Sequence, residues 1–146
     1  MRCDVTKEVE IIMKGTSVEE ADAADNGVET RSKAEYFAKN GFHYVTYEEQ
    51  MEGVDTPVKN WLKFKEDYFE VRKSGALSSQ MTFEEGKIYM TKYSTPYGDM
   101  IMGVKTHKLE VCESDTSITV VIRYDLETDE QLVAKMQMKI QICAIK

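Results

Sequence analysis

Apolar and polar residues alternate with a period of two along most of the chain, which is the pattern of β-strands with one buried face. The clearest case runs from Leu132 to Ile142, where the even-numbered residues are apolar and those between them are mostly polar. A helix would not keep these two sets apart. The alternation predicts about eleven short strands, over Val5–Lys14, Thr30–Lys39, Phe42–Glu49, Asn60–Lys65, Tyr68–Lys73, Ser79–Glu84, Lys87–Tyr93, Met100–Val104, Lys108–Glu113, Ser117–Asp125 and Leu132–Ile142.

Turn-forming residues separate many of these segments, among them Asn40-Gly41, Ser74-Gly75 and the stretch from Pro96 to Gly98. This spacing indicates antiparallel hairpins. Hairpin-connected strands in one small domain can share a core as a sandwich or as a closed barrel, and closure also removes exposed strand edges. The pattern does not choose between the two. No repeat or linker divides the chain, so we expect residues 1–146 to form one domain.

Composition and charge narrow the class of protein. Apolar residues make up 42% of the chain and charged residues 31%, as in an ordinary folded domain. With 19 basic and 26 acidic residues the net charge is −7, which makes nucleic acid an unexpected partner. No apolar run approaches the roughly 20 residues of a membrane helix, and residues 1–15 do not resemble a secretory signal. We therefore expect a cytoplasmic protein without a membrane segment.

Three motifs carry a resemblance to a known family: Tyr47-Glu48-Glu49, Arg72 followed by Gly75, and the run from Tyr93 to Gly98. Their order and spacing resemble the YwiB-like family, bacterial proteins classed as a domain of unknown function. The resemblance implies a calycin-like barrel, the architecture of lipocalins and fatty-acid-binding proteins, in a bacterial cytoplasmic protein. We therefore expect an all-β fold with a single antiparallel calycin- or lipocalin-like barrel of about 8–10 strands. The family supplies no activity.

The sequence shows no catalytic constellation. His43 and His107 have no Cys or His neighbour at the spacing of metal ligands. Glu48 and Glu49 are adjacent on a predicted strand, so their side chains point to opposite faces and cannot act as an acid–base pair. We expect a protein that is not an enzyme and that needs neither a metal nor a cofactor.

The barrel interior supplies the first candidate binding site. If Arg72 points inward, its guanidinium needs a carboxylate, either Glu49 or one carried by a ligand. Tyr47, Tyr93 and Tyr97 would add hydroxyl groups to such a site. Two alternatives remain open, a structural pair of Arg72 with Glu49 and an Arg72 exposed to solvent. The hypothesis is a binding protein for a small apolar or acidic molecule.

A basic stripe supplies the second candidate. Alternation places Lys59, Trp61, Lys63 and Lys65 on one face of a strand, opposite Asn60, Leu62 and Phe64. A tryptophan among three lysines could hold an anionic partner by cation–π and stacking contacts. The alternative is that the lysine stems simply cover Trp61. If the interior is packed solid, this outer face becomes the functional surface of an interaction module. The sequence leaves the oligomeric state open, a homodimer included.

Overall fold

The computed structural model describes residues 7–17, 28–49, 57–75, 78–95, 98–128 and 131–145, which form ten strands of a single sheet. Every paired neighbour in the sheet runs antiparallel, and the order is β6-β5-β4-β3-β2-β1-β10-β9-β8-β7. The strands are β1 (Lys7–Ser17), β2 (Val28–Lys39), β3 (Phe42–Glu49), β4 (Val58–Lys65), β5 (Tyr68–Ser74), β6 (Ser79–Phe83), β7 (Ile88–Thr95), β8 (Gly98–Glu113), β9 (Ser117–Thr128) and β10 (Gln131–Ala144).

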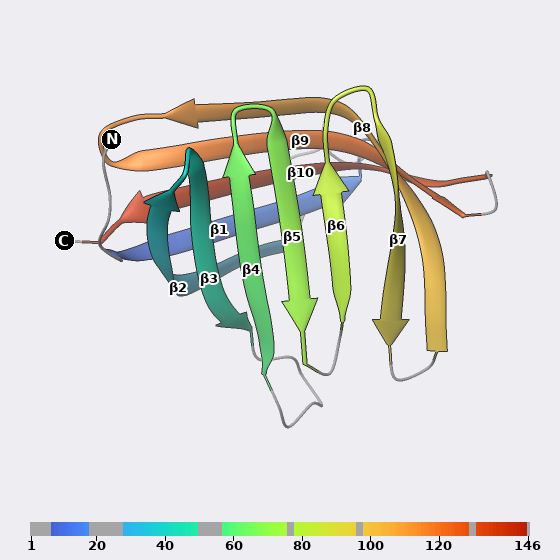
Figure 1. Cartoon of the computed structure of the whole chain (residues 1–146), viewed down its shortest axis with the longest axis horizontal. Coiled ribbons are helices and arrows are strands. Elements are labelled where there is room, and N and C mark those ends of the chain that lie inside the picture. The colour runs from blue at the N-terminus through green and yellow to red at the C-terminus, as the bar shows by residue number, and fades with distance from the viewer. Residues whose placement is uncertain are drawn as a thin grey trace.

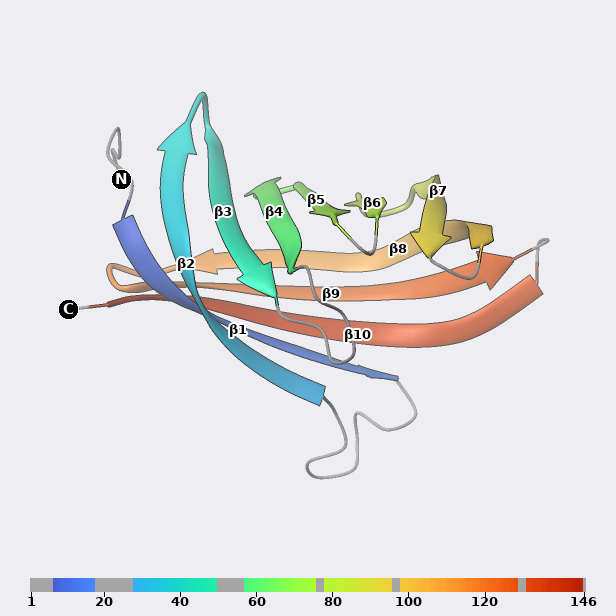
Figure 2. The ribbon, with the colours of Figure 1, turned by 90° about the horizontal axis from the view of Figure 1, so that it is seen from below.

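The sheet curls on itself, so that β3 to β7 lie over β8, β9 and β10 (Figure 2) and β6 comes beside β7 (Figure 1). At this seam the hydroxyl of Thr91 donates a hydrogen bond to the carbonyl of Gln80 at 2.9 Å. The predicted all-β fold and single antiparallel barrel are confirmed, in the form of a nearly closed ten-stranded barrel.

Two of the predicted strands are a single strand in the structure. Met100–Val104 and Lys108–Glu113 both belong to β8, in which a register shift against β9 falls between Thr106 and Lys108. This bulge moves the buried face from even to odd positions, from Val104 to Leu109. The change of phase is what made one strand look like two in the sequence.

The centre of the barrel is filled by side chains. The rings of Phe64 and Phe69 lie 5.2 Å apart and those of Phe69 and Phe83 lie 6.2 Å apart, and all three residues are at most 1% exposed. Aliphatic residues from both layers pack around them, including Ile11, Val45, Leu62, Val104, Val120, Ile122 and Ile140. Leu62, Phe64 and Ile140 lie on the apolar faces that the alternation separated in the sequence.

The sheet divides between β2 and β3. The two strands pair only from Lys39 opposite Phe42 to Glu35 opposite Thr46. Beyond that point β2 stays with β1, and β3 stays with β4 as far as Glu49 opposite Val58. We call the place where the strands diverge the fork. It gives polar side chains of the inner face a route to the surface at one end of the barrel.

Candidate functional site

Arg72 lies on the outer face of β5, so the inward orientation considered from the sequence is wrong. Its neighbours Phe69 and Val71 are buried, and the alternation of a strand then turns Arg72 outward. The Arg72 side chain is 56% exposed, and its Nη2 lies 3.9 Å from the Oε2 of Glu70. The alternative of an exposed Arg72 is the one that the structure adopts.

Lys73 supplies the basic group that the inner face has in place of Arg72. It pairs across the sheet with Asn60, which in turn pairs with Tyr47. Its Nζ lies 3.3 Å from the Oε1 of Glu49, and the two side chains are 26% and 34% exposed. The internal pair between a cation and Glu49 therefore exists, one position further along β5 than expected.

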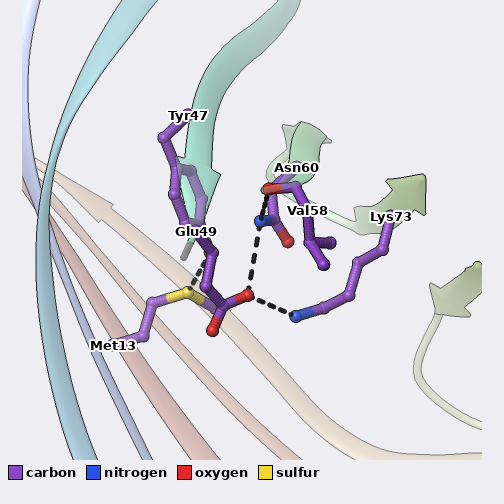
Figure 3. Close-up of polar contacts among 6 residues, drawn as sticks. All are labelled: Met13, Tyr47, Glu49, Val58, Asn60 and Lys73. Carbon is purple, nitrogen blue, oxygen red and sulfur yellow. Dashed lines mark hydrogen bonds and ion pairs between the residues drawn. The ribbon is translucent and has the colours of Figure 1, made fainter. Parts of the chain in front are cut away.

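These residues form a polar cluster at the fork, which we call the fork site: Met13, Tyr47, Glu49, Asn60 and Lys73. Figure 3 shows the side chains of Glu49, Asn60 and Lys73 converging on one carboxylate oxygen, with Tyr47 above Met13. The Asn60 amide nitrogen lies 3.5 Å from the Glu49 Oε1 and 3.3 Å from the Val58 carbonyl oxygen. Strands β1, β3, β4 and β5 each contribute, so the whole fold is needed to assemble the cluster.

Asn60 is unusual within the fork site because it is completely buried and only half satisfied. The residue is 0% exposed, and its Oδ1 has no hydrogen-bond partner among the residues that the structure describes. A buried amide oxygen left without a donor costs about 1–3 kcal/mol. Leucine would fill a similar space without that penalty, so the amide is a candidate for a functional role.

Tyr47 joins the fork site to the core. The residue is 8% exposed, and its hydroxyl donates to the Met13 Sδ at 2.8 Å. Burial, and to a lesser degree the charge of Glu49, raise the pKa of the Tyr47 phenol well above its usual value. Tyr47 therefore acts as a neutral hydroxyl at physiological pH. A hollow of about 340 Å³, also lined by Glu35, Glu48 and Lys59, opens beside it.

The described part of the fork site does not include the other two tyrosines of the predicted interior site. Tyr93 belongs to β7, where its backbone pairs with Met100, and in the sheet order β2, β1, β10, β9 and β8 lie between that strand and β3. Tyr97 lies outside the described residues. Of the five residues predicted from the sequence, the structure brings together Tyr47 and Glu49.

The basic stripe lies on the outer face of β4, as the alternation predicts. Lys59 and Lys65 are exposed, Trp61 and Lys63 are partly exposed, and the residues between them are buried. The Lys59 Nζ lies 4.8 Å from the Trp61 ring centroid. Lys65 pairs with Asp67 at 3.7 Å. Lys59 and Lys63 form no ion pair with any carboxylate of the described residues.

Aromatic residues of the neighbouring strands extend the stripe into a broader surface, which we call the outer aromatic face. The Lys63 Nζ lies 4.5 Å from the centroid of Phe42 and 6.0 Å from that of Tyr44. Tyr44 stacks on Phe37 at 4.8 Å, and Phe42 meets Tyr68 edge to face at 5.9 Å. Four strands, β2 to β5, thus present rings and ammonium groups together on one side of the molecule.

Comparison with known proteins identifies the family of this chain. The family model described as "Domain of unknown function (DUF1934)" matches residues 11–140. The chain belongs to the DUF1934 family. A solved structure, "Crystal structure of ywiB protein from Bacillus subtilis", matches this DUF1934 chain with a TM-score of 0.80 and 20% sequence identity, over 97% of this chain and 94% of the other. The expected YwiB-like relationship is confirmed. No sequence among the curated proteins matches the chain.

Three residues of the fork site in this DUF1934 chain, Met13, Asn60 and Lys73, were not among the predicted site residues, and the sequence carries a signal for the last two. Asn60 is the polar member of a buried set that continues with Leu62 and Phe64. In the same way, Lys73 lies on the same face of its strand as Phe69 and Val71. A polar residue at a buried position of a strand indicates either a hydrogen-bond network or a binding site.

Within the described residues, no group of three or more His, Cys, Asp and Glu side chains is arranged to hold a metal ion. The same part of the chain contains no helix long and apolar enough to cross a membrane.

Proposed function

We propose that this DUF1934 domain binds a small polar molecule at the fork site, without chemical turnover. The observation that carries the proposal is the Asn60 Oδ1, a fully buried acceptor that receives no donor from the described part of the chain. It lies beside an ion pair that is about one-third exposed, where a small molecule can be exchanged with solvent. A ligand that donates to Asn60 removes the cost of the unpaired oxygen, and that relief adds to its affinity.

The hydrogen-bonding capacity of the fork site indicates the chemistry of the ligand. Glu49 uses Oε1 for both of its contacts, with Lys73 and with Asn60, which leaves Oε2 available as an acceptor. Lys73 carries further N–H donors beyond the one that Glu49 accepts. The complement is a small molecule with an N–H or O–H donor for Asn60 and Glu49, and a carboxylate or carbonyl oxygen for Lys73. This ligand is more polar than the apolar or acidic molecule expected from the sequence, because the apolar centre is filled.

Native mass spectrometry of gently purified protein tests the proposal. We expect an additional mass on the wild-type chain that is lost on denaturation and is absent from Lys73→Met. Arg72→Leu is the matched control, because it removes a cation from the adjacent position on the outer face and is expected to retain the mass. A bare wild-type chain would contradict ligand binding. Equal retention by both variants would contradict this site.

A second candidate function rests on the outer aromatic face, where Lys59 and Lys63 contact rings and no carboxylate of the described residues. We propose that this face docks a short acidic segment of a partner protein. Three stripe lysines are too few for a nucleic acid, whose many phosphates would be repelled by this chain's net charge of −7. Trp61 is the chain's only tryptophan and reports on the face directly.

Titration with an oligoglutamate peptide, followed by Trp61 fluorescence, tests this second function. We expect saturable quenching that Lys63→Ala weakens by about fivefold, the loss of a contact worth about 1 kcal/mol. Lys92→Ala is the control, because Lys92 pairs with Asp99 at 3.2 Å on β7, away from the stripe. Quenching that is unaffected by Lys63→Ala would exclude the outer aromatic face as the docking surface.

A further inference from the structure

His43 lies at the opposite end of β3 from the fork site and joins two layers of the barrel. Its Nε2 lies 3.4 Å from the Oε1 of Glu113 on β8, a strand that is five places from β3 in the sheet order. Its Nδ1 lies 2.7 Å from the hydroxyl of Tyr36. Because a carboxylate only accepts, Nε2 carries the proton and Nδ1 accepts from Tyr36 in the neutral ring. The Tyr36–His43 hydrogen bond and the His43–Glu113 polar contact thus link three side chains across one end of the barrel.

Packing holds this chain of three side chains in place. The His43 ring stacks on Phe64 at 4.9 Å and its side chain is 14% exposed, while Tyr36 is 3% exposed. Glu113, in contrast, has a side chain that is 52% exposed. The buried His43 and Tyr36 side chains orient the Glu113 carboxylate, which itself remains accessible to solvent.

A hollow of about 370 Å³ lies directly beside these residues, where β8 turns into β9. Its walls include the buried apolar residues Val9, Ile118 and Ile142, and its polar lining includes Tyr36 and Glu113. This volume is at the lower end of the range of about 300–1,000 Å³ for small-molecule sites. Apolar walls with a few convergent polar groups are the usual composition of such sites.

The charges around the hollow determine which head group fits. Glu113 and Asp115 line it as anions, and Lys7 lines it as a cation, so the acidic groups outnumber the basic one. A carboxylic acid would bring a further negative charge towards Glu113. An ammonium group can instead donate to the exposed Glu113 oxygen while its apolar body contacts Val9 and Ile118.

We propose that this hollow is a binding site for a small organic amine with an apolar body, recognised by the Glu113 carboxylate that His43 and Tyr36 hold in position. The site is separate from the fork site and does not depend on it. It shares no residue with the fork site, and its ligand has the opposite character, a largely apolar molecule with one cationic group.

Three probes with the same tail test the choice of head group: octylamine, octanol and octanoate, titrated into methyl-labelled protein by NMR below their aggregation concentrations. We expect saturable shifts of the Ile118 and Ile142 methyl signals with octylamine, and at least about tenfold weaker binding of octanoate, as for the loss of one charge-assisted hydrogen bond. Equal affinity for octylamine and octanoate would overturn the proposal.

Two variants locate the amine. Glu113→Gln is expected to weaken octylamine binding about tenfold, while Glu110→Gln, at a similarly exposed position of β8 that pairs with Lys108, leaves it unchanged. Ala144→Leu, which places a larger side chain at the lining of the hollow, is expected to weaken all three probes. Thermal melts show whether each variant is folded. Unchanged octylamine binding by folded Glu113→Gln would also overturn the proposal.

Discussion

Replacing Asn60 with leucine is expected to stabilise the free protein while abolishing its function. The substitution removes a buried oxygen without a partner, which relieves about 1–3 kcal/mol. It also removes two hydrogen bonds of the amide nitrogen, at 3.3 and 3.5 Å. Both are longer than a good N–H···O bond, so their loss costs about 0.5 kcal/mol each. The side chain that replaces the amide is of similar size and wholly apolar. The net expectation is a gain of about 1 kcal/mol, or about 3 °C in Tm for a chain of this length.

Urea unfolding followed by Trp61 fluorescence and by circular dichroism measures this change through the transition midpoint at constant slope. Thr106→Val is the matched control. Thr106 is 1% exposed, and its hydroxyl oxygen is likewise buried without a partner, but it lies in β8, away from the fork. We expect it to gain up to about 1 kcal/mol with no effect on ligand retention.

The two variants together can refute the reasoning. If Thr106→Val is stabilised while Asn60→Leu loses more than about 1 kcal/mol, the two amide bonds outweigh the unpaired oxygen, and the cost assigned to Asn60 is wrong. If Asn60→Leu is more stable yet retains the ligand mass, Asn60 plays no part in binding. A more stable variant that loses the mass is the result expected of a residue kept for function at the expense of stability.

Three further predictions concern stability and local opening. Burial raises the pKa of the Tyr47 phenol in the folded protein, so this phenol ionises more readily in the unfolded chain and stability falls as the pH rises above about 10. Tyr47→Phe is expected to flatten this decline, as measured by urea unfolding between pH 9 and pH 11. Gly75→Ala is expected to cost at least about 2 kcal/mol of stability, because Gly75 has a φ of +129° and a Cβ there would lie 2.7 Å from the Pro57 carbonyl oxygen. Gly86→Ala is expected to cost about 1 kcal/mol, because Gly86 has a φ of +77° but open space around it. Equal losses of stability in urea unfolding would contradict this account. Thr91→Val removes the side-chain bond across the seam and is expected to speed amide exchange in β7 about fivefold, with β10 unchanged.

The strands and the buried face could be predicted from the sequence because both depend on local alternation. The pattern over Lys59–Lys65 separated the inner and outer residues of that segment of β4 correctly. Arg72 was ambiguous because Tyr68 and Phe69 are both aromatic, so either parity of β5 offered an apolar start. The buried ring of Phe69, packed between Phe64 and Phe83 from neighbouring strands, decides the orientation.

The fork site and the proposed amine-binding hollow beside His43 and Glu113 could not be predicted in the same way, because each depends on contacts between distant segments. Glu49 and Lys73 are 24 positions apart, and His43 and Glu113 belong to strands on opposite layers. No local pattern indicates that β2 leaves β3 after Glu35. The bulge in β8 also lies outside a strict alternation, because it changes the parity of the strand midway.

The order of the sheet has a consequence for how the polypeptide could be reconnected. The physical edges of the sheet, β6 and β7, are consecutive in the middle of the sequence, whereas β1 and β10, the outermost strands of the sequence, are paired through Val9 and Ala144. Joining residues near these two ends by a short linker and opening the chain between β6 and β7 would give the order β7-β8-β9-β10-β1-β2-β3-β4-β5-β6. Every strand would then pair with its neighbour in sequence, as in an uninterrupted meander. In the natural chain β1 pairs with a strand more than a hundred residues away. The permutant replaces this pairing with one between consecutive strands, so it is expected to fold faster than the natural chain.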